Sequence, residues 1–500
     1  MLENQRLKIN EYLPTLNALT IGVLLGGLGG LLALLLILEG PVIAIGLILA
    51  AMIGLVGLSN LDASLALVLI LTGLLPFGTL PFKIAITPSL IDAALGLFIV
   101  VYLFQWMTGR RHDLQTTPVH GVIVLFILLM VFAFVLGMPN GTLTPGILRR
   151  FLGLMANVGL SLILVDVVRR AETLRRLALT FMVIGAVAGV VGSVLWILND
   201  AAANVILNRL VRIGYPGGDV LRYREDSVQI LGERAIGTWV DPNAFGGFLM
   251  MVGALIAPQL LARRPLTGHR WIMFILMACV GAGLFLSDSR GSMLGLLAGL
   301  SLVAVIRYRS LIWVLLLLIA IAPFNPITAG YVDKIIAGFT ASDLETQMRL
   351  GEYKDAFILI GRYPVFGVGF ISPPDIDLYV GFASTYLTIA ANSGIVGLVM
   401  YLITLLSVFS YGYRHRAAID QNNEINDIWL GLFAGVVAAM VGGVFDHFYF
   451  NIEFQATSLT VWFFVGLLLA ATRLAVPVNE EEALGLPRVP RLKRVEPLND

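Results

Sequence analysis

Long uninterrupted apolar segments constrain the fold of this chain more than any other feature. Runs of about 18 to 25 apolar residues match a helix that crosses a hydrocarbon core about 30 Å thick, because a helix rises about 1.5 Å per residue. Apolar residues make up 58% of the 500 residues, and charged residues only 13%. A soluble protein of this size cannot bury so much apolar surface. The sequence therefore predicts an all-α fold, a polytopic transmembrane helix bundle.

About 12 to 14 spans are expected from the number of such segments. The first segment is too long for a signal peptide and is followed by many more, so we expect it to be a retained span. The predicted spans lie near residues 17–38, 41–59, 62–80, 88–107, 119–138, 149–168, 177–199, 238–261, 271–288, 292–306, 310–325, 384–412, 428–446 and 455–473.

Basic residues in the short loops predict the orientation of the bundle, since such loops face the cytoplasm. Arg6 and Lys8 precede the first span, and every second loop after it is basic. Both termini are therefore expected in the cytoplasm. The basic residues of these loops and of the tail are Arg110, Arg111, Arg169, Arg170, Arg175, Arg176, Arg263, Arg264, Arg270, Arg307, Arg309, Arg414, Arg416, Arg488, Arg491, Lys493 and Arg494.

The same alternation assigns two long loops to the outer face. In the second loop, charged and apolar residues recur at helical spacing over 345–362, which predicts an amphipathic helix at the membrane surface or over a cavity. The expected organisation is N-terminal spans in 1–200, a first extracytoplasmic loop in 200–237, spans in 238–325, a second extracytoplasmic loop in 326–383, C-terminal spans in 384–473 and a disordered cytoplasmic tail in 474–500.

Several functions lack support in the sequence. The net charge of +1 gives no electrostatic footprint for nucleic acid, and the single cysteine excludes disulfides and thiolate metal sites. Nucleotide-binding, dinucleotide-binding and zinc-protease motifs are absent from the sequence. We therefore expect no metal site and no cofactor. Two glycine series, Gly185/Gly189 and Gly291/Gly295/Gly299, are expected to allow close helix contacts.

Polar residues gather at four places on the expected outer face: 234–243, 287–291, the second long loop and 446–447. The planar guanidinium group binds phosphate through two hydrogen bonds, so several outer arginines favour a phosphate or diphosphate ligand. Two structural alternatives stay open. Arg290 could pair with Asp288 or anchor at lipid headgroups, and Arg234 could pair with Glu233 or Asp241.

His447 is the one histidine expected at the outer face, and Asp446 beside it could orient the ring. A structural role near the end of a helix is the alternative. The other histidines lie on or near the expected inner side and are interpreted as part of the basic loops. These are His112, His120, His269 and His415.

Over about residues 230 to 470 the chain resembles the superfamily of O-antigen ligases and O-antigen polymerases, which are bacterial membrane glycosyltransferases. The order and spacing of several motifs carry the resemblance. The motifs are Arg234 with Gly237 and Asp241-Pro242-Asn243, Ser289-Arg290-Gly291, Arg362-Tyr363-Pro364 with Gly367 and Gly369, Ser384 with Tyr386-Leu387, Asn392 with Gly394 and Gly397, and Asp446-His447-Phe448.

The resemblance implies transfer or polymerisation of a glycan from an undecaprenyl diphosphate carrier to an acceptor hydroxyl. It places the enzyme in the bacterial cytoplasmic membrane, with an extracytoplasmic active site. The implied partners are the carrier-linked donor, a glycan or lipid-linked acceptor, membrane lipids and other polysaccharide assembly proteins, and no nucleic acid. The catalytic candidates are Arg234, Arg290, Asp446 and His447; the candidates for binding diphosphate or glycan are Arg349, Arg362, Asp241, Asn243 and Tyr386.

One departure from the family pattern affects the expected mechanism. Ligases of the family carry a histidine just before the segment that begins here at Ser384, whereas this chain has Ala383. The departure favours a polymerase or a divergent member over a ligase, and it leaves His447 or Asp446 as the candidate base. A transporter or flippase and an inactive assembly scaffold are the alternative functions.

Overall fold

The computed structural model describes residues 60–80, 87–225, 230–371 and 382–476. Within these ranges the fold is all-α apart from one two-stranded hairpin, which confirms the predicted fold class. The expected spans near 17–38 and 41–59 lie outside the described residues, as does nearly all of the predicted tail. The number of spans therefore stays a prediction.

Apolar helices occupy the predicted spans that the structure describes, and further elements fill the two long loops. The α-helices are α4 (Leu61–Leu74), α5 (Leu90–Met107), α6 (His120–Gly137), α7 (Pro145–Val167), α8 (Ala171–Ile197), α9 (Asp200–Asn208), α10 (Pro242–Leu261), α11 (Arg270–Leu286), α12 (Arg290–Ile306), α13 (Ser310–Ile321), α14 (Pro326–Thr340), α15 (Leu344–Arg362), α16 (Thr385–Arg414), α17 (Arg416–Gln421), α18 (Asn426–Phe445) and α19 (Gln455–Ala475). The 3₁₀ helices are η2 (Met138–Asn140), η3 (Arg209–Ile213), η4 (Ala322–Phe324) and η5 (Phe448–Phe450); the strands are β1 (Arg222–Glu225) and β2 (Ile230–Arg234).

Eight helices in the described part of the chain are long and apolar enough to cross a membrane: α5, α6, α7, α8, α10, α16, α18 and α19. Three shorter apolar helices, α4, α11 and α12, accompany them. Helix α13 leads through a sharp bend into α14 and α15. Length and composition together identify the chain as a polytopic membrane protein.

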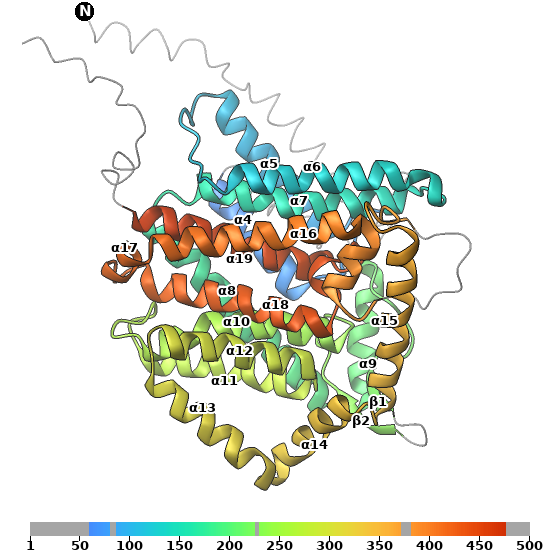
Figure 1. Cartoon of the computed structure of the whole chain (residues 1–500). Coiled ribbons are helices and arrows are strands. Elements are labelled where there is room, and N and C mark those ends of the chain that lie inside the picture. The colour runs from blue at the N-terminus through green and yellow to red at the C-terminus, as the bar shows by residue number, and fades with distance from the viewer. Residues whose placement is uncertain (1–59, 81–86, 226–229, 372–381, 477–500) are drawn as a thin grey trace, which may run out of the picture.

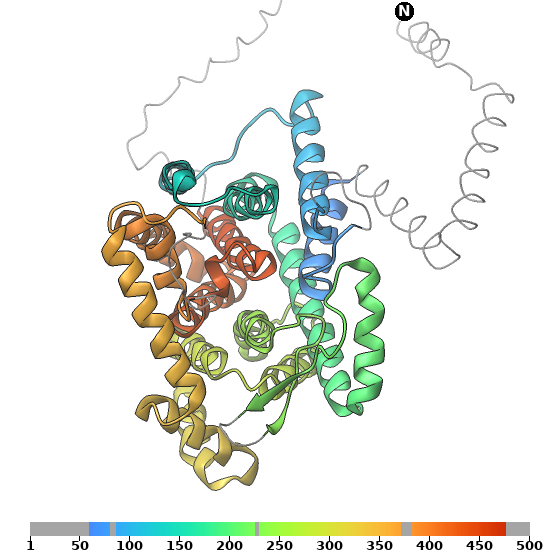
Figure 2. The same ribbon diagram turned by 90° about the vertical axis from the view of Figure 1, so that its right-hand side faces the viewer.

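Most of these helices run side by side, while α15 crosses one end of the bundle at a steep angle (Figure 1). Helix α9 and the hairpin lie at the same end, which Figure 2 shows with several bundle helices seen end-on. We call the end covered by α9, β1–β2 and α15 the capped end. The helical pattern predicted over 345–362 corresponds to α15.

Small residues bring the central helices into direct backbone contact. A Cβ atom on Gly295 would lie 2.7 Å from the carbonyl oxygen of Ala438, so only glycine allows α12 to approach α18 this closely. A Cβ on Gly189 would lie 2.3 Å from the carbonyl oxygen of Cys279, which brings α8 equally close to α11. The packing role predicted for the two glycine series is thus confirmed at these positions.

A glycine junction fastens the chain after α15 to the kink of α16. Gly394 interrupts the helical backbone of α16 with φ 71° and ψ −177°. On either side of this kink, the N–H of Val368 donates to the carbonyl of Ala391 at 2.9 Å, and the N–H of Ile395 donates to the carbonyl of Pro364 at 2.8 Å. The glycines of the motifs around 367 and 394 are therefore explained by this junction between the two segments.

We predict that Gly394→Ala destabilises the protein by more than about 1 kcal/mol, the lower end of the cost of a backbone conformation that is nearly restricted to glycine. Its Cβ would also lie 2.0 Å from the carbonyl oxygen of Val365. Thermal unfolding of the purified protein in detergent measures the change. Gly361→Ala is the matched control, since no atom lies within 4 Å of its Cβ position. Equal melting temperatures for the two variants would contradict the junction.

Candidate functional site

Three of the predicted arginines come together at the capped end: Arg234 from β2, Arg290 from α12 and Arg349 from α15. Arg290 is the first residue of α12, which the Ser289 side chain caps. Its Nη2 contacts Asp343 Oδ2 at 2.7 Å and Glu345 Oε2 at 2.8 Å. Arg290 therefore ties the start of α12 to the start of α15.

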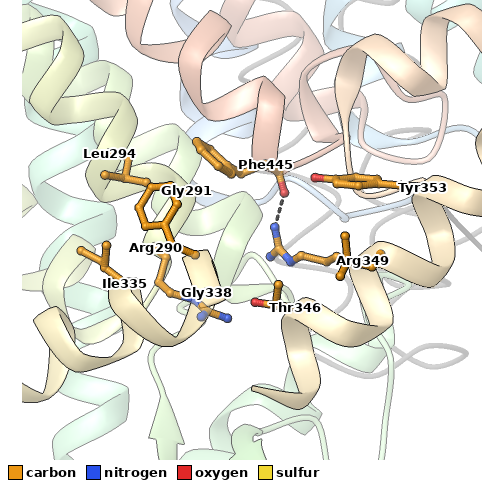
Figure 3. A pocket seen from close by; sticks show the side chains of 11 residues that line it. Arg290, Gly291, Leu294, Ile335, Gly338, Thr346, Arg349, Tyr353 and Phe445 are labelled. Atoms are coloured by element: carbon orange, nitrogen blue, oxygen red, sulfur yellow. Dashed lines mark hydrogen bonds between the residues drawn. The ribbon is translucent and has the colours of Figure 1, made fainter. Parts of the chain in front are cut away.

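Arg349 makes the second connection between α15 and the bundle. Its Nη2 lies 2.8 Å from Glu345 Oε1, one helical turn away, and 3.5 Å from Asp446 Oδ1. Its Nη1 donates to the backbone carbonyl of Phe445, the last residue of α18 (Figure 3). Glu345 thus bridges Arg290 and Arg349 with its two carboxylate oxygens.

Arg234 holds the entrance of α10 against the turn between α11 and α12. It donates to the carbonyl of Ser287 at 3.0 Å, to the side-chain oxygen of Asn243 at 2.5 Å and to the carbonyl of Asp288 at 3.3 Å. Its charge also acts on the carboxylates of Asp446 and Glu345, and it opposes the rise that burial causes in the pKa of Asp446. We call Arg234, Arg290, Arg349, Glu345 and Asp446 the arginine cluster.

Asp241 and Asn243 serve the local structure at this entrance. Asp241 precedes Pro242, the first residue of α10, and its Oδ1 accepts hydrogen bonds at 2.8 Å from the backbone N–H groups of Asn243 and Ala244. It is an N-cap, which satisfies donors that the first helical turn leaves open. Asn243 in turn orients the Arg234 guanidinium.

A cavity of about 220 Å³ opens beside Arg290 and Arg349. Its wall has two chemically different parts (Figure 3). The two guanidinium groups, Thr346 and Tyr353 are polar, whereas the rest of the wall is apolar or glycine: Leu294, Ile335, Phe339, Leu350, Phe445, Gly291 and Gly338. The cavity can receive a ligand with an anionic group joined to an apolar one.

Asp446 lies immediately beyond α18 and is only 5% exposed. Burial raises the pKa of its carboxyl to about 7, against the lowering effect of Arg349. Its backbone carbonyl accepts hydrogen bonds from the Thr385 backbone N–H at 2.9 Å and from the Thr385 hydroxyl at 2.8 Å. Asp446 is thereby fixed between the ends of α18 and α16.

His447 points into an aromatic setting rather than toward the cavity wall residues named above. Its ring lies 4.4 Å from the Phe448 ring and 5.4 Å from the Phe454 ring, measured between centroids. Its Nδ1 lies 2.8 Å from the side-chain nitrogen of Asn451. Burial and the charge of Arg349 lower the pKa of His447 to about 4, so the ring is neutral at physiological pH.

Two predicted binding residues lie apart from the cavity wall. Arg362 is exposed at the last position of α15, 13 residues beyond Arg349 and so about 20 Å farther along the helix. Tyr386 is half-buried, and its hydroxyl donates to the carbonyl of Met440 in α18 at 2.7 Å. The structure brings neither side chain to the arginine cluster.

The helical pattern over 345–362 includes Glu345 and Tyr353 on neighbouring faces, but it does not indicate that Glu345 bridges two arginines or that Tyr353 lines a cavity. Asp343 and Thr346 were not predicted. The spacing of four between Glu345 and Arg349 is typical of an ion pair along a helix and was a usable signal. The contact of Asp343 with Arg290 joins residues 53 positions apart. Nothing local in the sequence marks such a contact.

Residues 272–402 match the O-antigen ligase family. This match confirms the resemblance seen in the motifs, and it covers the chain from α11 into α16, with Arg290 and Arg349 inside it and Arg234 and Asp446 outside. No curated protein matches the chain. The family match supports a role in glycosyl transfer during polysaccharide assembly at a membrane.

We predict that Asp241→Ala lowers the free energy of unfolding by about 0.5 to 2 kcal/mol, the usual cost of losing an N-cap. Asp241→Ser should retain most of the stability, because its hydroxyl can accept from the same N–H groups. Thermal unfolding in detergent compares the three proteins. A serine variant as unstable as the alanine variant would show that Asp241 does not act as a cap.

Proposed function

We propose that the protein transfers or polymerises a glycan carried by a polyprenyl diphosphate, of the undecaprenyl type, onto an acceptor hydroxyl at the extracytoplasmic face of the cytoplasmic membrane. The observation that carries the proposal is the cavity between α12, α14, α15 and α18, where two arginines adjoin an apolar wall. A lipid-linked diphosphate has the same two parts in one molecule.

The arginine cluster suits the chemistry of this reaction. A diphosphate is already a good leaving group, so the main requirement is stabilisation of the charge that develops as it departs. Fixed guanidinium donors in a partly dry cavity supply this stabilisation. Because no second covalent step is needed, direct attack of the acceptor inverts the anomeric carbon; a product with retained configuration would contradict this mechanism.

Two carboxylates, those of Glu345 and Asp343, form ion pairs with the guanidinium groups when no anion is bound. Glu345 contacts Arg290 and Arg349 at 2.8 Å each, and Asp343 contacts Arg290 at 2.7 Å. A buried arginine without a partner is costly, so these contacts keep the empty site stable. In the proposed mechanism the diphosphate takes over part of this pairing when the donor binds.

A transporter and an inactive scaffold are the competing functions. Transporters place ionisable groups near the middle of their spans. Here Asp92 lies in the first turn of α5 and Asp166 lies near the last residue of α7, and the charged cluster lies at the capped end. This placement favours chemistry at the surface of the membrane over passage across it.

We predict that Arg290→Ala and Arg349→Ala each lower the rate of glycan transfer about a hundred- to a thousandfold, as expected for the loss of one donor to a developing charge. Complementation of a deletion strain, followed by glycan analysis, measures the effect. Lys354→Ala, an exposed change on α15, is the matched control. Normal glycan from both arginine variants, at normal protein levels in the membrane, would overturn the proposed site.

The deletion strain also separates the two candidate reactions. Carrier-linked sugars that accumulate as single repeats would identify a polymerase, and long chains without an acceptor would identify a ligase. Unchanged carrier-linked sugars together with a defect in their translocation would instead support the transporter.

We predict that labels at the capped end react from outside the cell. Cys279 is the only cysteine, so Cys279→Ala gives a background for single cysteines. Pro216→Cys and Lys354→Cys, both at exposed positions, should react with a membrane-impermeant maleimide in intact cells. His269→Cys, in the loop between α10 and α11, should react only after the cells are opened. The reverse pattern would place the arginine cluster in the cytoplasm.

A further inference from the structure

We infer that Asp446 is the base that accepts the proton of the acceptor hydroxyl, and that His447 is a positioning residue. The inference rests on the proposed function and assigns a role that the sequence left open between the two residues. It follows from which polar atoms in the arginine cluster are already engaged.

The Asp446 carboxylate is buried but can accept further hydrogen bonds. Among the residues that the structure describes, its one polar side-chain contact is with Arg349 Nη2 at 3.5 Å, which is too long for a strong hydrogen bond. A carboxylate that is only 5% exposed normally accepts several hydrogen bonds, so this one is open to a further donor. An acceptor hydroxyl is such a donor.

The neighbouring carboxylates are paired more closely than Asp446. Both oxygens of Glu345 contact arginines at 2.8 Å, and Oδ1 of Asp241 accepts two backbone N–H groups at 2.8 Å. Asp343 Oδ2 contacts Arg290 at 2.7 Å, while its Oδ1 is buried without a hydrogen-bond partner among the described residues. The close contact with Arg290 lowers the pKa of Asp343, whereas Asp446 is only weakly paired, so Asp446 is better able to take up a proton from a substrate.

Gly291 packs closely against the Asp446 carboxylate. Gly291 lines the cavity as the second residue of α12, and a Cβ at this position would lie 2.9 Å from Asp446 Oδ2. Any side chain there would press on the carboxylate oxygen. Gly291 and Arg349 are both wall residues, so the carboxylate lies just behind the wall, beside the proposed diphosphate site.

The surroundings of Asp446 bring the pKa of its carboxyl near neutral pH. Burial raises its pKa to about 7, Arg349 and Arg234 lower it, and Asp241 and Glu345 raise it. Titratable groups face it from four packed elements: Arg349, Glu345 and Tyr353 from α15, Arg234 from β2, Asp241 before α10 and Tyr449 from η5. A base is most effective when its pKa lies near the working pH.

His447 is unsuited to the same task. Its Nδ1 is engaged with Asn451 at 2.8 Å, and its ring packs against Phe448 and Phe454. These contacts fix the turn that follows Asp446. His447 therefore acts on the reaction through the position of Asp446.

In the proposed step, the acceptor O–H gives its proton to the Asp446 carboxylate while the acceptor oxygen bonds to the anomeric carbon of the donor. The bond between that carbon and the diphosphate oxygen breaks, and its electron pair leaves with the diphosphate. Arg290 and Arg349 stabilise the charge on the leaving group. Asp446 then returns its proton to solvent.

The inference is tested by measuring how the glycan transfer rate of purified protein depends on pH. The proteins compared are the wild type, Asp446→Asn, His447→Gln and Glu424→Gln, and the donor is the carrier-linked glycan that accumulates in the deletion strain. For the wild type, kcat/KM should rise with pH through about 7, because the carboxylate forms as the pH rises past its pKa. Asp446→Asn should lose about a hundredfold or more and show no such rise. His447→Gln should be slower but keep the inflection, and Glu424→Gln, at an exposed position, should match the wild type.

Binding of farnesyl diphosphate distinguishes a variant that lacks the base from a variant that does not fold. Its stabilisation of Asp446→Asn against thermal unfolding would show a folded protein with an intact diphosphate site. An Asp446→Asn enzyme that retains the wild-type rate and inflection would overturn the inference, as would an inflection that disappears in His447→Gln alone. A wild type that transfers no glycan would instead overturn the proposed function.

Discussion

The Glu345 carboxylate lies between two guanidinium groups that come from different helices, and the candidate site depends on this contact. Its two oxygens contact Arg290 and Arg349 at 2.8 Å each. Without it, two largely buried positive charges would face each other at the end of an apolar bundle, at a high cost in free energy. The same contact holds α15 across the ends of the bundle helices. It therefore both positions part of the cavity wall and places the charged groups in that wall.

Close packing of the bundle makes this arrangement possible. Glycines on α12 let it touch the backbone of α18, which brings the first residue of α12 beside the last residue of α18. Gly291, the second residue of α12, therefore packs against Asp446 and Phe445, more than 150 positions later in the sequence. The glycine junction at the kink of α16 fixes the other end of α15 in the same way. A rigid frame thus presents a small number of charged groups, as preorganised stabilisation of a leaving group requires.

The sequence alone was sufficient for the fold class, for the apolar helices in the described residues and for α15, because apolar length and periodicity are local properties. It also selected Arg234, Arg290 and Asp446, since charge at the end of an apolar span is rare enough to notice, and the family resemblance added Arg349. It did not predict α9, α14 or the β1–β2 hairpin in the long loops. It could not show that Asp343 and Glu345 neutralise those arginines, or that Tyr386 bonds the carbonyl of Met440. Such pairings join distant segments and depend on the angle at which α15 crosses the bundle.

In the proposed function, the arginine cluster binds a diphosphate joined to an apolar chain. The most direct test is the thermal unfolding of purified protein in detergent with increasing farnesyl diphosphate, and with farnesol as the uncharged counterpart. We predict that farnesyl diphosphate raises the melting temperature of the wild type, that farnesol has little effect, and that the double variant Arg290→Ala/Arg349→Ala loses the response. An equal rise in the wild type and the double variant would contradict the claim.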